Sequence, residues 1–367
     1  MSPPPSWDER DRALMARALE LAQRGLYSAR PNPMVGCVIE REGQVVGEGW
    51  HERAGEPHAE VLALREAGDR ARGATAYVTL EPCAHHGRTP PCADALVEAG
   101  VARVVAAMRD PFPRVDGAGF ARLQAAGIEV ASGLLEAQAR ELNRGFLSRV
   151  ERGRPWLRLK CAASLDGRVA LANGESRWIT GEAARRDVHA LRARSCAMLT
   201  GIGTVLRDDP QLTVRHVPCS RQPRRVVIDS RLELPPGARI LAGEPPLVLT
   251  VSEDRARRQA LEARGAEVVT VPAEGAKTDL AAVARLLAER GFNEVTVETG
   301  AKLNGALLRA GVVDEIVLYL APLLMGDAAQ GLFALPGFEA LGEAPRLRWI
   351  DRRVVGADLR LTARLET

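Results

Sequence analysis

Two cysteines and a histidine pair lie close together in the stretch LEPCAHHGRTPPC, which begins at Leu80. All four side chains are of types that bind metal ions. Cys92 follows two prolines at the expected start of a helix, where the helix dipole lowers the pKa of a thiol and favours the thiolate that a metal requires. His85 and His86 follow Cys83 closely, and either of them on the metal would close the site to water. We therefore expect the two cysteines to bind the metal and the histidine pair to shape a substrate pocket or to face solvent.

A third ligand is expected from the upstream segment EPHAEV, which carries His58 and Glu60 at the start of a helix. The order His-x-Glu followed by Pro-Cys is the arrangement of zinc deaminases. One His and two Cys ligands leave the fourth tetrahedral position open for water, which zinc makes acidic enough to attack near neutral pH. Glu60, which need not be a ligand, can carry the proton of that water to the departing amine. The pattern predicts a catalytic zinc site on His58, Cys83 and Cys92. A purely structural zinc site is the alternative, but it needs a fourth protein ligand and has no use for Glu60.

Length and composition favour a folded enzyme with a small substrate. The 367 residues predict two domains. A formal charge of +3 without blocks of like charge does not suggest a nucleic-acid or membrane partner. A nucleic-acid base deaminase, a further alternative, should have a basic, aromatic-rich surface, whereas aromatic residues make up 4% of this chain. The sequence contains neither a signal-peptide pattern nor a bilayer-spanning apolar run. Six dispersed cysteines favour a reducing cytoplasm.

The elements that must position these side chains alternate between strands and helices up to about residue 150. Strands are expected over residues 35–39, 45–49, 74–80, 101–108 and 128–131, and helices over residues 12–24, 58–67, 93–99, 120–126 and 135–147. Cys83 thus follows a strand, whereas His58 and Cys92 lie at helix starts. The alternation predicts an α/β layer.

A second, different α/β domain is expected after the linker ERGRPW, over residues 151–367. Its predicted strands cover residues 157–163, 196–200, 225–228, 247–251, 267–271, 294–298 and 315–320, with helices over 183–194, 255–264, 280–290 and 303–310 and β-like segments at 346–350 and 354–361. The turn at Gly300, between a strand and a helix, fits a pyrophosphate, because free N–H groups at a helix start bind phosphate and Gly300 and Gly305 let it come close. An ordinary strand-turn-helix connection is the alternative.

Four stretches of the first half resemble the deaminase half of the bifunctional riboflavin-biosynthesis deaminase/reductase: ARPNPMVGCVI, GEGWHERAGEPHAEVLAL, AYVTLEPCAHHGRTPPC and RVVAAMRDPFP. The general cytidine-deaminase pattern has two residues between its cysteines, whereas this chain has the eight that the narrower family is expected to have. The resemblance implies a cytidine-deaminase-like three-layer α/β/α domain over residues 1–150. It also implies zinc on His58, Cys83 and Cys92, with Glu60 as the proton carrier. Asn32 is a candidate contact for the pyrimidine, with a turn-forming asparagine as the alternative.

The second half resembles the reductase half of the same enzyme in the stretches KCAASLDGRVA, GESRWITG, TGIGTVLRDDPQLTVR, VVIDSR and VETGAKLNGALL. The resemblance runs from about Asp11 to the end of the chain and implies a dihydrofolate-reductase-like α/β domain that uses NADPH. Carried over by position, it places the cofactor against Ala162, Trp178, Thr204, Asp208, Ser230, Gly300, Ala301, Lys302, Leu303, Asn304, Gly305 and Ala306. It places the substrate against Ser176, Arg192, Leu212, Arg215 and Glu298.

The resemblance implies two consecutive steps of riboflavin biosynthesis. The first is zinc-dependent hydrolytic deamination of 2,5-diamino-6-(5-phosphoribosylamino)pyrimidin-4(3H)-one to 5-amino-6-(5-phosphoribosylamino)uracil. The second is NADPH-dependent reduction of the ribosyl group to ribityl, for which Lys160 or Asp208 could supply the proton. Ser230 and Arg231 offer a hydroxyl and a cation suited to the 2′-phosphate of NADPH. We further expect a cytoplasmic homo-oligomer whose partner is the phosphorylated pyrimidine, with no nucleic-acid or membrane partner.

Overall fold

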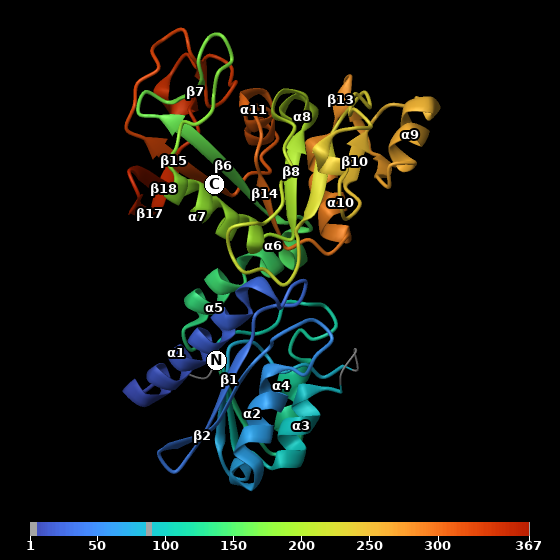
Figure 1. The fold of residues 1–367 in the computed structure, drawn as a ribbon. Helices are drawn as coiled ribbons and strands as arrows, with labels where there is room; N and C mark the ends of the chain where they lie inside the picture. Colours follow the sequence, from blue (N-terminus) through green and yellow to red (C-terminus); the bar gives the residue numbers. More distant parts are fainter. Residues whose placement is uncertain (1–5, 86–89, 367) are drawn as a thin grey trace. The chain divides into compact units, whose positions relative to one another are not determined.

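Two compact units, Met1–Arg152 and Gly153–Thr367, make up the chain, and each has its own sheet (Figure 1). The computed structural model describes residues 6–85 and 90–366, so His86 lies outside the described residues. Among the residues described, no helix combines the length and the apolar character that crossing a membrane requires. The division between the units falls inside the segment ERGRPW.

The first unit is built on a five-stranded sheet in the order β2-β1-β3-β4-β5. β1 is antiparallel to β2 and β3, whereas β3, β4 and β5 run parallel. The strands are β1 (Gly36–Arg41), β2 (Gln44–Trp50), β3 (Thr75–Val78), β4 (Arg103–Ala106) and β5 (Glu129–Ser132). Glu42 and Gly43 have φ angles of 49° and 86° and form the tight turn of the β1–β2 hairpin.

Helices cover both faces of this sheet. They are α1 (Glu9–Gln23), α2 (Ala59–Ala67), α3 (Cys92–Ala99), α4 (Ala118–Ala125), α5 (Glu136–Leu142) and α6 (Arg144–Arg152), with the short 3-10 helices η1 (Arg24–Tyr27) and η2 (Gly68–Ala71). Val38 of β1 packs in a core with α1, α5 and α6, while its neighbours Cys37 and Ile39 pack in a second core with α2, α3 and α4. This alternation is the two-residue period of a strand. The predicted three-layer α/β/α fold is confirmed.

Two glycines of β2 let α2 approach the sheet closely. A Cβ atom at Gly47 would lie 2.2 Å from the carbonyl oxygen of Ala63, and one at Gly49 would lie 2.4 Å from that of Ala59. Any larger residue at either position would push the helix off the sheet. Because α2 begins directly after His58, this contact sets the position of the metal-binding helix start.

The single helix predicted over residues 135–147 is wrong, since two helices, α5 and α6, meet at Asn143. The buried Asn143 side chain accepts the N–H of Met34 at 2.8 Å and donates to the carbonyl of Met34 at 2.9 Å. These two hydrogen bonds fix Asn143, the residue at which the two helices meet, to the backbone of Met34.

The second unit is built on a nine-stranded sheet in the order β11-β10-β9-β8-β14-β6-β15-β18-β17. The seven strands from β11 to β15 in this order are parallel, whereas β18 is antiparallel to both of its neighbours, β15 and β17. The strands are β6 (Trp156–Ser164), β8 (Ala197–Gly201), β9 (Arg224–Ile228), β10 (Leu247–Thr250), β11 (Glu267–Thr270), β14 (Glu294–Val297), β15 (Glu315–Ala321), β17 (Leu347–Val355) and β18 (Asp358–Leu365).

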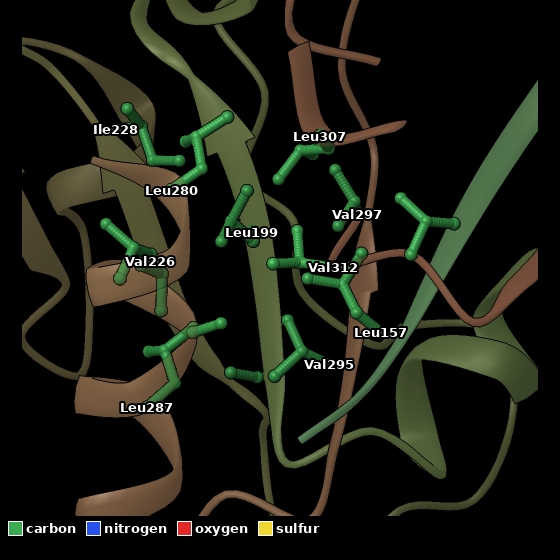
Figure 2. Packing of buried hydrophobic residues seen from close by; sticks show 14 of the residues in the cluster. Leu157, Leu199, Val226, Ile228, Leu280, Leu287, Val295, Val297, Leu307 and Val312 are labelled. Carbon is green, nitrogen blue, oxygen red and sulfur yellow. The ribbon is translucent and has the colours of Figure 1, made fainter. Parts of the chain in front are cut away.

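The main core of this unit lies between the sheet and α10 and α11. Figure 2 shows Leu280 and Leu287 of α10 packed toward Leu199 of β8 and Val226 of β9. The helices are α7 (Glu182–Ala193), α8 (Ile202–Asp208), α9 (Arg255–Glu262), α10 (Leu280–Glu289) and α11 (Ala301–Arg309), with the 3-10 helices η3 (Arg239–Leu241) and η4 (Leu341–Glu343). A second core joins α8 and α9 to strands of the same sheet, and a third core joins α7 to it. This is the predicted dihydrofolate-reductase-like α/β domain.

Several short elements of the second unit were not predicted. They are α8, the hairpin of β12 (Ala273–Glu274) and β13 (Lys277–Thr278), and the pair β7 (Arg168–Ala170) and β16 (Gln330–Gly331). Segments of two to seven residues are too short to show a clear hydrophobic period.

Candidate active sites

Three side chains from separate segments converge in the first unit. His58 precedes α2, Cys83 follows β3, and Cys92 is the first residue of α3. Their candidate ligand atoms all lie within 4.8 Å of one another. Nδ1 of His58 is 3.0 Å from Sγ of Cys92 and 3.6 Å from Sγ of Cys83. Within the described parts of the chain, this is the only group of His, Cys, Asp or Glu residues with metal-ligand spacing. One imidazole and two thiols are ligands that zinc prefers, so the residues fit the predicted ion.

The surroundings of Cys83 favour its thiolate form. The side-chain hydrogen bond with Cys92 lowers the pKa of Cys83, and the hydrogen bond with His58 lowers it further. The backbone N–H of Cys92, in the first turn of α3, also donates to Sγ of Cys83 at 3.4 Å. The same hydrogen bond and burial raise the pKa of Cys92, so Cys83 alone is held as a thiolate here, whereas a bound metal would take both sulfurs as thiolates.

Glu60 lies in the first turn of α2, directly beside the three ligands. Its side chain is buried, and burial raises the pKa of this carboxyl to about 7. Oε2 has no hydrogen-bond partner, although it is shielded from solvent. A carboxyl group in this state can both accept and return a proton near neutral pH. The structure therefore places Glu60 where the sequence predicted a proton carrier.

A cavity of about 380 Å³ opens onto this group and is lined by His58, Glu60 and Cys83. His85 lines the cavity and is not part of the three-ligand group, and its part in shaping a substrate pocket stays a prediction. Asn32 lines it as well, with its Nδ2 3.0 Å from Nε2 of His51.

The sequence reasoning missed other residues that line this cavity, namely His51, Asp110, Phe112, Phe146 and Arg149. Asp110 comes soon after β4, which runs parallel to β3, the strand that Cys83 follows. The carboxyl ends of neighbouring parallel strands meet at one edge of a sheet, so this position could have been found from the predicted topology. Phe146 and Arg149 belong to α6, and no local pattern in the sequence marked them.

Glu81 holds the loop that forms one wall of the cavity. Its buried carboxylate accepts the backbone N–H groups of Asp110 (3.2 Å) and Gly117 (3.1 Å) on Oε2. It accepts those of Gly119 (2.9 Å) and Phe120 (3.3 Å) on Oε1. Four backbone donors, two in the loop before α4 and two in the first turn of α4, are therefore satisfied by one side chain.

A larger cavity, of about 1140 Å³, lies in the second unit. It is lined by residues that follow the carboxyl ends of the parallel strands β8, β9 and β14, which is where α/β sheets bind ligands. The predicted site residues among its lining are Ala162, Ser176, Arg192, Thr204, Asp208, Leu212, Ser230, Glu298, Gly300, Ala301, Lys302, Leu303, Asn304 and Ala306.

The start of α11 has the features of a pyrophosphate site. Gly300 is the N-cap residue, and no side chain caps the helix. A Cβ atom at Gly300 would meet nothing within 4 Å, and the same is true of Gly203 in the first turn of α8. Both glycines line the cavity. Free N–H groups beside open space suit the phosphates of a dinucleotide, so these residues fit NADPH.

Arg192 and Glu298 form a mostly buried ion pair in the wall of this cavity. Nε and Nη2 of Arg192 donate to the two carboxylate oxygens of Glu298 at 2.6 and 2.9 Å, and Nη1 donates to the carbonyl of Thr213 at 3.1 Å. Nζ of Lys160 lies 3.6 Å from the same carboxylate. Burial alone would raise the pKa of Glu298, but Arg192 and Lys160 lower it to about 2.

Three predicted site residues do not line the cavity. Trp178 is 72% exposed, and the guanidinium of Arg185 lies 4.7 Å from its ring centre. The Arg215 side chain donates to Gln211 and Thr213. A Cβ atom at Gly305 would lie 2.1 Å from the carbonyl oxygen of Ala334, so this glycine serves the packing of α11 against that segment.

Comparisons with known proteins cover both units. The family described as the RibD C-terminal domain matches residues 155–361, and the cytidine and deoxycytidylate deaminase zinc-binding region matches residues 8–108. The riboflavin biosynthesis protein RibD of Escherichia coli is 51% identical over 363 residues, which cover 95% of this chain and 98% of that protein. The RibD protein of Aquifex aeolicus is 42% identical over 96% of this chain and 97% of that protein.

Solved structures give the same result for the whole chain. One form of Acinetobacter baumannii RibD superposes with a TM-score of 0.91 at 46% identity, over 98% of this chain and 99% of that one. A Thermotoga maritima protein has a TM-score of 0.83 at 33% identity, over 97% and 98% of the two chains. That protein is described as a diaminohydroxyphosphoribosylaminopyrimidine deaminase/5-amino-6-(5-phosphoribosylamino)uracil reductase.

Proposed function

This chain belongs to the RibD family of bifunctional riboflavin-biosynthesis deaminase/reductases, and on that premise we propose that it catalyses both reactions itself. The first is hydrolytic deamination of 2,5-diamino-6-(5-phosphoribosylamino)pyrimidin-4(3H)-one to 5-amino-6-(5-phosphoribosylamino)uracil. The second is NADPH-dependent reduction of the ribosyl group to ribityl. The observation that carries the proposal is the convergence of His58, Cys83 and Cys92 beside the buried, unpartnered carboxylate oxygen of Glu60.

Deamination is assigned to the first unit, predicted as residues 1–150. His58, Cys83 and Cys92 would hold zinc, which when bound makes a water molecule acidic enough to react near neutral pH. Glu60 takes up the proton of the attacking water and delivers it to the departing amino group, and its pKa of about 7 suits both transfers. His85 and Asn32 shape the pocket around the pyrimidine. The loop held by Glu81 closes one side of this pocket.

Reduction is assigned to the second unit, predicted as residues 151–367. Residues Gly300 to Ala306, with Ala162, Thr204, Asp208 and Ser230, would hold NADPH, which supplies the hydride. Ser176, Leu212 and the Arg192–Glu298 pair would hold the ribose phosphate. Arg192 already binds Glu298, so we expect it to orient that carboxylate as well as to attract the phosphate. Lys160 and Asp208 both line the cavity, and either can supply the proton.

Trp178 and Arg215, which do not line the cavity, remain predicted contacts of cofactor and substrate. A cytoplasmic homo-oligomer is also part of the proposal. Its support is β17, which ends the strand order of the nine-stranded sheet and in which Trp349 and Val354 are 53% and 72% exposed. An exposed apolar edge of this kind suits a second copy of the chain.

The test is to supply the diaminopyrimidine phosphate and NADPH and to follow ammonia release and nicotinamide absorbance together. We expect ammonia to be released with or without NADPH, and NADPH to be oxidised only once deaminated product is present. Ammonia release without any NADPH oxidation would contradict the reductase assignment. NADPH oxidation on the undeaminated substrate would contradict the proposed order.

A further inference from the structure

Lysine is rare in this chain, and its few positions are not scattered. Only three of the 50 lysine and arginine residues are lysines: Lys160, Lys277 and Lys302. All three line the cavity of the second unit, although only about a tenth of the chain does so. Random placement would seldom put all three there. Lysine is a compact point charge that suits a single phosphate, whereas arginine is a planar fork.

Two of these lysines already belong to features described above. Lys160 contacts Glu298, and Lys302 lies in the first turn of α11 at the predicted pyrophosphate site. Lys277 has no such assignment. It lies on the β12–β13 hairpin, which was not predicted from the sequence.

The hairpin is tied to Ser230, the residue predicted to meet the 2′-phosphate of the cofactor. The backbone N–H of Thr278 donates to Oγ of Ser230 at 3.2 Å, and both residues are buried. Because Ser230 Oγ accepts this bond, its own O–H is left to donate to a ligand. The hydrogen bond also brings the residue next to Thr278, which is Lys277, to the rim of the cavity at Ser230.

Arg231, the cation that the sequence suggested for this phosphate, is less well suited. Its Nε lies 3.4 Å from a carboxylate oxygen of Glu233, and both residues line the same cavity. Exposure does not separate the two cations, because Lys277 is exposed as well. Lys277, by contrast, makes no ion pair with any residue in the described parts of the chain. A phosphate would meet a cation that already contacts a carboxylate at Arg231 and one without an ion-pair partner in the described residues at Lys277.

We infer that Lys277, together with the Ser230 hydroxyl, recognises the 2′-phosphate of the adenosine ribose and so sets the preference for NADPH over NADH. The inference rests on the proposed reductase function and names the residue of that site which selects the cofactor. Arg231 is then a neighbour held by Glu233, without a direct part in the selection.

The test compares two small probes that differ only in the phosphate concerned, adenosine 2′,5′-bisphosphate and 5′-AMP. Binding of each to the full chain is measured by calorimetry for the unmodified protein, Lys277→Gln, Lys277→Arg and Arg231→Gln. Arg255→Gln, an exposed position of α9 that does not line the cavity, controls for the loss of one positive charge.

We expect Lys277→Gln to weaken binding of the bisphosphate about 10-fold, which is the effect of one charged hydrogen bond to phosphate. Binding of 5′-AMP should stay within about 2-fold of that by the unmodified protein. Lys277→Arg should recover most of the loss, and Arg231→Gln should resemble the Arg255→Gln control. The ratio of the KM for NADH to the KM for NADPH should fall by the same factor in Lys277→Gln, with kcat little changed.

A bisphosphate preference that survives in Lys277→Gln but disappears in Arg231→Gln would overturn the inference and leave the reductase assignment intact. Equal binding of both probes by the unmodified chain would overturn the NADPH assignment, and the inference with it.

Discussion

Replacing Glu81 by alanine would remove the acceptor of four backbone N–H groups in the loop of residues 110–120. A buried donor left unsatisfied costs about 1–3 kcal/mol, and water that enters the vacated space recovers part of this cost. We expect a net loss of about 3 kcal/mol, concentrated in this loop. Since about 1.4 kcal/mol corresponds to a factor of ten, the open form of the loop should become about 100-fold more populated.

Hydrogen–deuterium exchange measures this opening directly. Peptides that cover residues 109–121 should exchange about 100-fold faster in Glu81→Ala, while peptides of the second unit keep their protection. Exchange in Glu81→Gln should be faster than in the unmodified chain and slower than in Glu81→Ala, because the glutamine amide keeps one acceptor oxygen but turns an N–H₂ group toward two donors. Glu98→Ala, an exposed glutamate of α3, is the matched control and should change nothing.

Ammonia release should fall as residues 109–121 lose their protection from exchange, because the loop forms a wall of the cavity that holds Glu60. The reasoning is refuted if the exchange of residues 109–121 in Glu81→Ala stays within about 3-fold of the unmodified chain, a difference of less than 1 kcal/mol.

Two further predictions concern the charges of the two sites. The pKa of Glu298 lies at about 2, below its ordinary 4.5, so its carboxylate stabilises the fold fully above pH 4.5 and ceases to do so as the pH falls toward 2. The free energy of unfolding of the second unit, measured with denaturant, should fall by about 3 kcal/mol across that window, and Glu298→Gln should remove most of this pH dependence. A free energy of unfolding that depends on pH as steeply in Glu298→Gln as in the unmodified chain would contradict the role of the ion pair. Chelation of the metal at His58, Cys83 and Cys92 should abolish ammonia release but spare NADPH oxidation with deaminated substrate, and elemental analysis of the purified chain should find about one zinc ion per chain. Loss of both activities on chelation would contradict two independent sites.

The metal site could be predicted because its residues are rare types in short, fixed patterns. His58 and Glu60 stand two residues apart at a helix start, and Cys83 and Cys92 each border an element that the hydrophobic pattern already marked. The alternation of strands and helices in both units was predicted because apolar segments of strand and helix carry their own period, whereas the specific folds came from the family resemblance.

What the sequence could not show depends on contacts between distant residues. The helix break at Asn143 follows from hydrogen bonds to Met34, 109 residues away. The engagement of Arg192 by Glu298 joins residues 106 apart, so a local pattern could not reveal that the arginine already has a partner. The β12–β13 hairpin has two residues in each strand and gave no period to detect.

Glu60→Gln tests the two-site account most directly. The substitution keeps the size of the side chain but removes its ability to carry a proton. Ammonia release from the diaminopyrimidine phosphate should fall at least about 1000-fold, near the middle of the range for a general acid–base group. NADPH oxidation with 5-amino-6-(5-phosphoribosylamino)uracil supplied directly should stay within about 2-fold of that of the unmodified chain, since Glu60 belongs to the other unit. Loss of both activities, or retention of ammonia release, would contradict the account.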